Sequence, residues 1–256
     1  SNPANDDPNW MEIWNDVFMQ YNKKEDGTFE PLAQQNVDTG MGLERVAAVL
    51  QKVGNVYETD KLQILFKKVL SLCEYPGLHN YEPLQHGENA ARIITDHLRA
   101  ATFMIADGVI PSNIDQGYVL RKLIRRAIRS ARTMKIKYEG DFCISVGKTV
   151  IDEYTTAYPF LREKSNLILE TLKNEEIKFK DSLDDGFRRF EFAHFTAPGA
   201  PYHETKVTAI EAFDLYTTYG FPLEIIKDEA KFRNIPLEDN LDEKFNKLFN
   251  DFKELS

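Results

Sequence analysis

The segment from residue 118 to residue 137 most narrowly constrains how this chain folds, because it presents two different faces at helical spacing. Its apolar side chains recur every three or four residues and form one stripe: Leu120, Leu123, Ile124, Ala127, Ile128 and Ala131. Four arginines, spaced four, four and three residues apart, stack on another face: Arg121, Arg125, Arg129 and Arg132. The segment therefore predicts a long helix with one face in a core and a cationic face opposite.

The charge of this segment departs from that of the whole chain. The 256 residues have a formal net charge of −9, but residues 118–137 contain eight cationic side chains and no acidic one. Like charges four residues apart repel in a helix and arginine forks match phosphate oxygens, so the pattern favours a phosphate-binding face. Two alternatives stay open: arginines that pair with acidic residues elsewhere in the fold, and a membrane-surface helix. The stripe lacks Trp and Phe, which disfavours the membrane.

A polar turn, residues 110–117, precedes this segment. Ser112 and Asn113 in such a turn can cap the N-terminus of a helix, which is the simplest interpretation. The side-chain amide of Asn113 also carries a donor and an acceptor, so it is suited to reading the edge of a nucleic-acid base. The sequence leaves both roles open.

Helical spacing of apolar residues dominates the rest of the chain. We expect helices in nine places, at residues 43–53, 60–75, 89–107, 116–137, 142–158, 163–193, 208–219, 223–232 and 242–255. Residues 10–38 instead combine aromatic and β-branched residues around a turn at 22–27, which predicts a hairpin. Residues 196–201, Thr-Ala-Pro-Gly-Ala-Pro, form the clearest linker. The pattern predicts an α+β chain that is mainly α.

Composition disfavours several classes of protein. Apolar residues make up 42% of the chain, enough for a core, and no apolar run reaches the roughly 20 residues that cross a bilayer. Two cysteines, Cys73 and Cys143, make no disulfide framework, so we expect a reducing cytoplasm. The histidines, including His97 beside Asp96, have no ligand spacing, so we expect no metal site.

The step Asp-Thr-Gly-Met-Gly at residues 38–42 joins the expected hairpin to the first helix. Gly40 and Gly42 let a ligand approach the backbone, and the helix N-terminus behind them offers free N–H groups to an anion. Arg45 would project near that end, within reach of a triphosphate, and Asp38 is a natural partner for an ammonium group. A Gly-x-Gly pair alone is usually only a turn. The acidic residue before it and the Glu-Arg pair after it make the pattern more specific.

Four separated segments, in order along the chain, together resemble alanyl-tRNA synthetase, a class II aminoacyl-tRNA synthetase. Residues 36–45, Asn-Val-Asp-Thr-Gly-Met-Gly-Leu-Glu-Arg, look like that family's third class II motif. Residues 12–21 are similar to the strand that lines its alanine pocket. Residues 105–126 look like its acceptor-stem region, and residues 215–222 resemble a later signature. The resemblance therefore covers almost all of the chain beyond its first few residues.

The resemblance implies roles for individual residues. Asn15, Asp38 and Gly40 would hold alanine, with Asp38 opposite its ammonium group. Gly42 and Arg45 would contact ATP. The tRNA acceptor stem would be bound by six side chains, of which the asparagine reads a G·U wobble pair: Asn113, Arg121, Lys122, Arg125, Arg126 and Arg129. No side chain is expected to be a catalytic nucleophile, since positioning and charge stabilisation carry such chemistry.

The implied reaction has two steps. ATP and alanine form alanyl-adenylate, and the 3′ end of tRNA(Ala) then takes the alanyl group. ATP and Mg²⁺ serve the whole enzyme, and no editing-domain zinc is expected here. The resemblance also predicts three parts of the chain: the end of the class II antiparallel catalytic sheet at 1–54, a helical tRNA-recognition region at 55–195, and a linker with a helical segment at 196–256.

The chain departs from the family pattern in two respects. The first two class II motifs are absent, so we expect a piece of a longer enzyme that is inactive without the remainder of its own chain. Thr217 stands where the family signature has an aspartate that joins the asparagine in reading the wobble pair. The rival interpretation is a non-catalytic helical nucleic-acid-binding module. It explains the basic segment but not residues 36–45.

Overall fold

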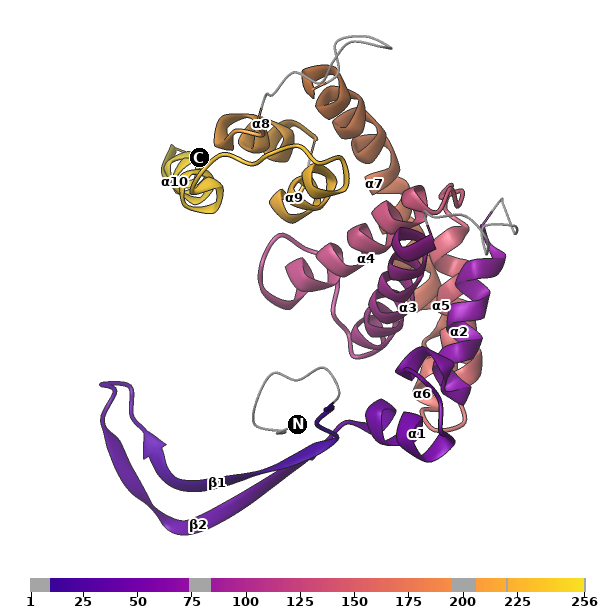
Figure 1. Ribbon diagram of the computed structural model, residues 1–256, viewed down its shortest axis with the longest axis vertical. Coiled ribbons are helices and arrows are strands. Elements are labelled where there is room, and N and C mark those ends of the chain that lie inside the picture. The colour runs from indigo at the N-terminus through magenta and orange to yellow at the C-terminus, as the bar shows by residue number, and fades with distance from the viewer. Residues whose placement is uncertain (1–9, 74–83, 195–205, 220, 256) are drawn as a thin grey trace. The chain divides into compact units, whose positions relative to one another are not determined.

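The computed structural model describes residues 10–73, 84–194, 206–219 and 221–255 of the chain. The described residues form two compact units, with the boundary between Ile64 and Leu65. Helices predominate in the described residues, with one two-stranded antiparallel sheet, so the expected α+β class, mainly α, is confirmed (Figure 1). The linker expected at 196–201 and Gly220 of the later signature lie outside the described residues.

The sheet is a hairpin of β1 (Trp14–Lys23) and β2 (Phe29–Met41). In its turn the Gly27 N–H donates to the Lys24 carbonyl oxygen (3.0 Å), and Gly27 takes a φ of 83°, which glycine adopts without strain. The expected hairpin is therefore confirmed, but its second strand is longer than predicted. Because β2 runs on to Met41, the Asp-Thr-Gly-Met step belongs to the strand.

Two helices and a short turn follow the hairpin. α1 (Leu43–Gln51) begins directly after Gly42, whose N–H donates to the Ile13 carbonyl oxygen (2.9 Å) just before β1. This bond ties the start of the helix to the start of the hairpin. A 3₁₀ turn, η1 (Val56–Glu58), then leads into α2 (Asp60–Ser71). Apolar spacing predicts both α-helices, and both are present.

The second unit is built around α3 (Leu84–Ala106) and α4 (Asp115–Thr133), which pack against each other and against α7 (Ser165–His194). α5 (Phe142–Tyr154) packs on α3 and α7, and the short α6 (Phe160–Glu163) contacts all three (Figure 1). The core lies where the apolar stripes of these helices meet, and it includes the fully buried side chains of Leu98, Ile124, Val146, Leu172 and Phe179.

Three further helices complete the second unit: α8 (Ala209–Tyr219), α9 (Leu223–Phe232) and α10 (Leu241–Leu255). α8 packs on α7 and α10. Phe221, between α8 and α9, is fully buried, with its ring centroid 5.0 Å from that of Phe187 on α7. A Cβ at Gly186 would lie 2.9 Å from the Phe221 ring, so the absence of a side chain there lets α7 accept this aromatic contact.

The expected helices are present, and the differences lie mainly at their ends. α4 stops at Thr133, before the expected residue 137, and Lys135 beyond it takes a left-handed φ of 54°. α3 begins at Leu84, earlier than the expected residue 89. α6, which follows Pro159, is too short to show a period and is not predicted by apolar spacing. Among the described helices, none combines the length and the apolar character needed to cross a bilayer.

Candidate functional site

The apolar stripe of α4 lies in the core of the second unit, as expected. Five of its six predicted members are fully buried: Leu120, Ile124, Ala127, Ile128 and Ala131. Leu123 is half-buried. The burial of this stripe fixes the rotation of α4, and so decides which other helices its arginines face.

The cationic side chains of α4 meet carboxylates of the fold itself. On α7, Glu175 Oε1 lies 2.9 Å from Arg125 Nε and 3.5 Å from Arg121 Nε. The guanidinium of Arg125 also lies over the ring of Phe179, 4.6 Å from its centroid. Lys122 Nζ lies 2.5 Å from Glu224 at the start of α9. Pairing with acidic residues elsewhere in the fold was one of the alternatives left open by the sequence, and these pairs are present.

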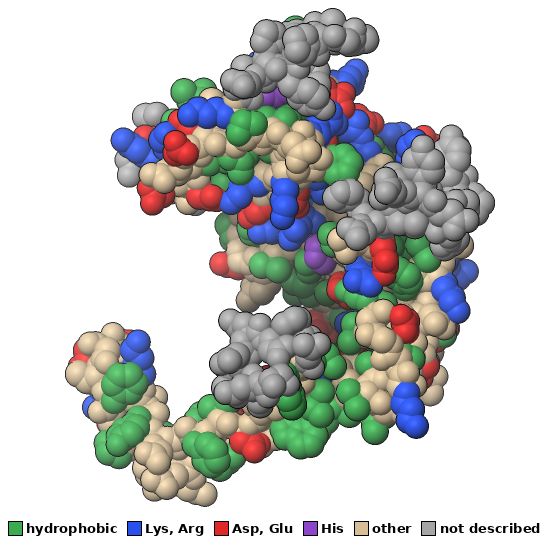
Figure 2. Space-filling view, in the orientation of Figure 1, with side chains coloured by type: hydrophobic (Ala, Val, Ile, Leu, Met, Phe, Trp, Pro, Cys, Tyr) green, Lys and Arg blue, Asp and Glu red, His purple; other side chains and the backbone are tan. Residues whose placement is uncertain are grey.

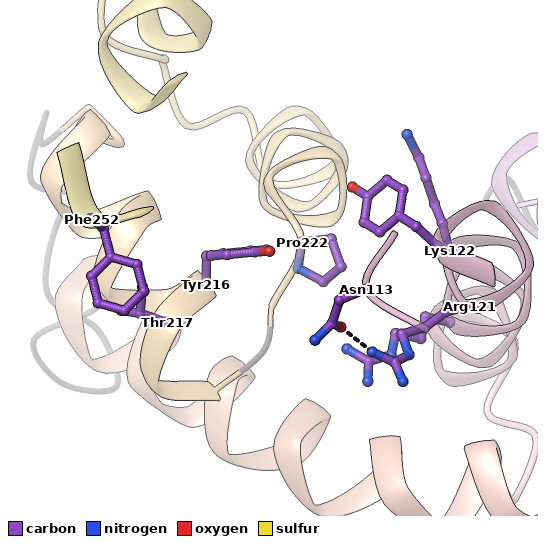
Figure 3. A pocket seen from close by; sticks show the side chains of 9 residues that line it. Asn113, Arg121, Lys122, Tyr216, Thr217, Pro222 and Phe252 are labelled. Atoms are coloured by element: carbon purple, nitrogen blue, oxygen red, sulfur yellow. Dashed lines mark hydrogen bonds between the residues drawn. The ribbon is translucent and has the colours of Figure 1, made fainter. Parts of the chain in front are cut away.

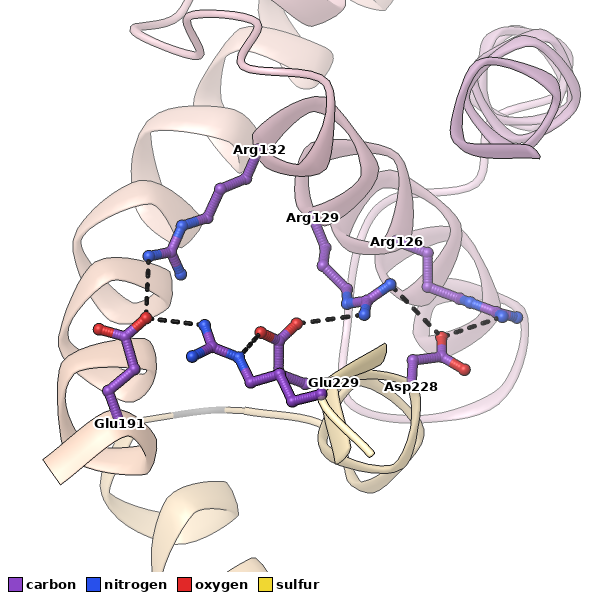
Figure 4. Close-up of polar contacts among 7 residues, drawn as sticks. Arg126, Arg129, Arg132, Glu191, Asp228 and Glu229 are labelled. Carbon is purple, nitrogen blue, oxygen red and sulfur yellow. Dashed lines mark hydrogen bonds and ion pairs between the residues drawn. The ribbon is translucent and has the colours of Figure 1, made fainter. Parts of the chain in front are cut away.

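A second group of ion pairs joins α4 to α9 (Figure 4). Arg126 Nη2 lies 3.3 Å from Asp228 Oδ2, and Arg129 Nη2 lies 3.2 Å from Glu229 Oε2. Glu229, whose side chain is 6% exposed, also accepts a hydrogen bond from Arg233 Nε (2.5 Å). The arginines therefore hold α9 against α4. RNA binding by the same side chains stays a prediction.

Asn113 and Thr217, far apart in the sequence, line one pocket of about 300 Å³ in the second unit (Figure 3). Residues before and on α4, at the end of α8, at the cap position of α9 and on α10 line this pocket: Asn113, Tyr118, Arg121, Lys122, Arg125, Tyr216, Thr217, Pro222 and Phe252. Four of the six side chains predicted for an acceptor stem are thus brought together with the signature residue. Sequence reasoning missed the aromatic lining, and Phe252 lies outside every segment that carries the resemblance.

The Asn113 side chain is held by α4 and does not cap it. Ile114 occupies the cap position of α4 and makes no side-chain cap, so the capping interpretation is wrong for Asn113. Asn113 Oδ1 instead accepts a hydrogen bond from Arg121 Nη1. Arg121 Nη2 also donates to the Pro111 carbonyl oxygen (3.4 Å). One guanidinium group therefore binds both the turn and the amide that the turn carries.

The turn before α4 is tightly folded and depends on Gly117. A Cβ at Gly117 would lie 2.2 Å from Ser112 Oγ and 2.5 Å from the Ile110 carbonyl oxygen, so no other residue fits there unless the turn moves. The Ser112 N–H donates to the Gly117 carbonyl oxygen (3.1 Å), which closes the turn onto the first residues of the helix. This turn sets the backbone position of Asn113 in the pocket.

Thr217 and its neighbours make hydrogen bonds within α8. The Thr217 hydroxyl donates to the Phe213 carbonyl oxygen (2.9 Å), one turn earlier. Asp214 accepts a hydrogen bond from the Thr218 hydroxyl (3.2 Å), and Asp214 does not line the pocket. At the other side of the pocket, burial raises the pKa of Tyr118, with Glu224 adding to the effect, so its phenol stays neutral.

The three residues predicted to hold alanine lie on one face of the hairpin. Directly paired residues of antiparallel strands share a face, and the ladder pairs Asn15 with Gly40, two residues from Asp38. A Cβ at Gly40 would lie 3.9 Å from Asn15 Oδ1, so the glycine keeps the space beside this amide open. Thr39 lies on the other face, where its hydroxyl donates to Asp16 Oδ1 (2.8 Å). The strand alternation therefore groups the predicted residues.

Gly42 and Arg45, predicted to contact ATP, adjoin at the start of α1. A Cβ at Gly42 would lie 3.1 Å from Arg45 Cδ, so the glycine lets this side chain fold back over the backbone. Arg45 Nη1 donates to the Glu12 carbonyl oxygen (2.8 Å). A guanidinium group has five donors of a kind that matches phosphate oxygens, and ATP binding by this pair stays a prediction. The described residues contain no cluster of three or more His, Cys, Asp or Glu side chains arranged to hold a metal ion.

The hairpin leaves large apolar side chains exposed on both faces (Figure 2). On the face opposite Asn15, Phe18 is 76% exposed and its cross-strand partner Val37 is 59% exposed. On the face of Asn15, Val17 is 48% exposed. In the described residues these side chains of the two-stranded sheet stay exposed, in contrast to the buried stripe of α4.

Comparison with known proteins gives the family. The family model described as tRNA synthetases class II (A) matches residues 1–250. This chain belongs to the class II (A) tRNA synthetases. The alanine–tRNA ligases of Coxiella burnetii (strain Dugway 5J108-111) and Synechococcus sp. (strain JA-3-3Ab) are each 42% identical to it, over 233 and 236 residues. That of Treponema pallidum (strain Nichols) is 42% identical over 228 residues.

The similarity covers most of this synthetase chain but only part of each relative. The aligned residues make up 91%, 91% and 87% of the chain, and 25%, 26% and 36% of the three relatives. The chain thus spans between a quarter and somewhat more than a third of their length. The resemblance to alanyl-tRNA synthetase inferred from the sequence is confirmed. Its segments fall on β1 and on β2 with α1 in the first unit, and on the end of α3 with α4 and on the end of α8 in the second.

Proposed function

We propose that this chain is part of an alanine–tRNA ligase, in which it supplies part of the alanine and ATP pocket and binds the acceptor stem of tRNA(Ala). The observation that carries the proposal is the pocket that Asn113 and the signature residue Thr217 both line. Relatives named alanine–tRNA ligases support it. The chain acts in the cytoplasm, together with the remainder of its enzyme.

For the acceptor stem we propose the predicted residues that line the pocket. Lys122 and Arg125 line the pocket together with Asn113, and each would exchange its carboxylate partner, Glu224 or Glu175, for a phosphate of the RNA. Arg126 and Arg129 differ from them because they do not line the pocket. Both pair with carboxylates of α9, so we assign them mainly to holding α9 in place.

In the first unit we propose that Asn15 and Asp38 hold the amino acid on their shared face. The Asp38 carboxylate would pair with the ammonium group, and Gly40 would leave room for the alanine methyl group. Arg45 would contact the phosphates of ATP, and Mg²⁺ would enter with those phosphates, since it binds phosphate oxygens and few protein carboxylates. The face is exposed, so the hairpin alone does not exclude water and the chain alone is not expected to activate alanine.

Binding of RNA tests the proposal. A fluorescent duplex with the acceptor-stem sequence of tRNA(Ala) is titrated with the chain at about 50 to 200 mM salt, and the anisotropy gives the affinity. We expect the logarithm of the affinity to fall linearly with the logarithm of the salt concentration, by about 0.9 per phosphate contact. An affinity that does not change with salt contradicts the proposal, because phosphate contacts release counterions.

A further inference from the structure

Glu175 of α7 is a nearly buried carboxylate that lies behind the pocket. Its side chain is 4% exposed, and its Oε1 lies close to the Nε atoms of both Arg121 and Arg125. A buried carboxylate is costly unless cations or hydrogen bonds compensate it. Glu175 therefore attracts both guanidinium groups and restrains where they lie on α4. It does not itself line the pocket.

Arg121 in turn fixes the orientation of the Asn113 amide. A guanidinium group only donates hydrogen bonds, so it can bind the oxygen of the amide and not its nitrogen. The Asn113 NH₂ group must then point away from Arg121, as Figure 3 shows. The described part of the chain offers Asn113 Nδ2 no hydrogen-bond acceptor. The amide thus presents a donor to the pocket.

Thr217 presents the opposite polarity to the same pocket. Its proton is committed to the Phe213 carbonyl oxygen, so Oγ1 can accept but has no proton left to donate. Asn113 and Thr217 together offer one donor and one acceptor. The minor-groove edge of a base pair that contains guanine has the complementary pattern, with the N2 amino donor beside base acceptors.

We propose that Glu175 and Arg121 are positioning residues that present the Asn113 amide as a hydrogen-bond donor to a base edge of the bound RNA, an inference that rests on the proposed function. Arg121 acts through Asn113 and does not bind a phosphate. Glu175 acts through Arg121. Thr217, where the family signature has an acid, supplies a neutral acceptor for the same edge.

Two substitutions separate positioning from phosphate binding. Arg121→Lys keeps the positive charge but loses the planar fork that holds both the amide and the turn. Glu175→Gln removes the charge that restrains Arg121, at a site too buried to touch RNA. Glu176→Gln is the matched control, because Glu176 binds backbone N–H groups at the start of α5 and no side chain of the pocket.

The readout is discrimination between two acceptor-stem duplexes that differ only in a G·U or a G·C pair, each measured over a salt series. We expect Arg121→Lys and Glu175→Gln to lose about three- to tenfold in discrimination, the range of one hydrogen bond. Glu176→Gln should keep the discrimination of the wild-type chain. Arg121→Gln should leave the salt slope unchanged, and a slope reduced by about 0.9 would instead assign Arg121 to a phosphate.

The outcomes distinguish this inference from the proposed function. A wild-type chain that binds neither duplex overturns the proposed function. A wild-type chain that discriminates, with discrimination intact in Arg121→Lys and Glu175→Gln, overturns only the positioning role.

A measurement without RNA tests whether Glu175 and Arg121 hold the side-chain amide of Asn113. In protein labelled with ¹⁵N-asparagine, the side-chain amide signals of Asn113 are identified by their absence from Asn113→Ala. We expect Arg121→Lys and Glu175→Gln to shift these signals, because the acceptor bond of the amide changes, and Glu176→Gln to leave them in place. Unshifted signals in both variants overturn the positioning role whatever the RNA affinity.

Discussion

At the scale of single residues, the buried carboxylate of Glu176 organises the backbone around it. Its oxygens accept hydrogen bonds from the N–H groups of Gly140 (2.7 Å) and Cys143 (2.7 Å), and the side chain is fully buried. Such N–H groups at a helix start have no partner within the helix, so Glu176 satisfies donors that α5 leaves open. Burial, and after it the charge of Glu176, raises the pKa of the Cys143 thiol, which keeps this thiol protonated and unreactive.

Replacing Glu176 by alanine should destabilise the second unit. Buried N–H groups without an acceptor each cost on the order of 1–3 kcal/mol, so we expect Glu176→Ala to lower the free energy of unfolding by about 3 kcal/mol. Urea unfolding followed by circular dichroism measures this loss. Glu170→Ala, at an exposed position of the same helix, should change stability by less than about 0.5 kcal/mol. Equal effects of the two substitutions would show that Glu176 does not cap α5.

His97 should make the stability of the fold depend on pH. Burial and, after it, the charge of Arg126 lower its pKa to about 4, against the opposing effect of Asp96 and Asp228. The unfolded chain therefore binds a proton below its ordinary pKa of about 6.5, while the folded chain stays neutral. The resulting stability is present above that ordinary pKa and is lost as the pH falls towards 4.

The measurement is thermal unfolding at about pH 7.5 and pH 5.5. Between about pH 7.5 and pH 5.5 the free energy of unfolding should fall by on the order of 1 kcal/mol more in the wild-type protein than in His97→Gln, because glutamine has no proton to take up. The comparison of one variant with wild type removes the contribution of the other titrating groups. An identical pH dependence in the two proteins would contradict a depressed pKa for His97.

At the scale of helices and strands, the parts predicted well are those set by local pattern. The burial of the apolar stripe of α4 follows from apolar spacing alone, because residues at helical spacing lie on the same face of the helix and pack together against a core. Partners of the arginines could not be predicted, since Glu175 and Glu229 reach α4 only through the packing of α7 and α9. Alternation along the hairpin does place Asn15 and Gly40 on one face, once the register is known.

The ion pairs that α9 makes with its neighbours should differ greatly in what they contribute to stability. Glu229 is 6% exposed and pairs with Arg129, which is 11% exposed, and with Arg233, so Glu229→Gln removes the closest carboxylate of one nearly buried cation and a carboxylate partner of a second cation. We expect a loss of roughly 3 kcal/mol in the free energy of unfolding. Asp242→Asn breaks the exposed pair with Lys227 and should cost less than about 1 kcal/mol. Urea unfolding of both variants gives the comparison, and a larger loss in Asp242→Asn would refute it.

At the scale of the whole molecule, the family and the mainly helical class could be predicted from the sequence, but the pocket could not. Asn113 belongs to the turn before α4 and Thr217 to α8, and no local pattern indicates that these segments meet. The resemblance suggested that both take part in one recognition event. The resemblance could not suggest two features that depend on tertiary packing. Phe252 of α10 is part of the pocket lining, and Arg121 donates a hydrogen bond to the side-chain amide of Asn113.

The hairpin should cause the isolated chain to associate with itself. Among the described residues no further strand pairs with either edge of the hairpin, and large apolar side chains are exposed on both faces, which is a template for pairing between copies. We expect sedimentation velocity in the micromolar range to show an average sedimentation coefficient that rises with concentration. Phe18→Lys combined with Val37→Glu should abolish the rise, because the two residues are cross-strand partners and opposite charges there remove the apolar surface while supporting the ladder. Ile210→Lys removes an equally exposed apolar side chain from α8 and should leave association unchanged. If this change also abolishes association, the contact between copies does not depend on the hairpin alone.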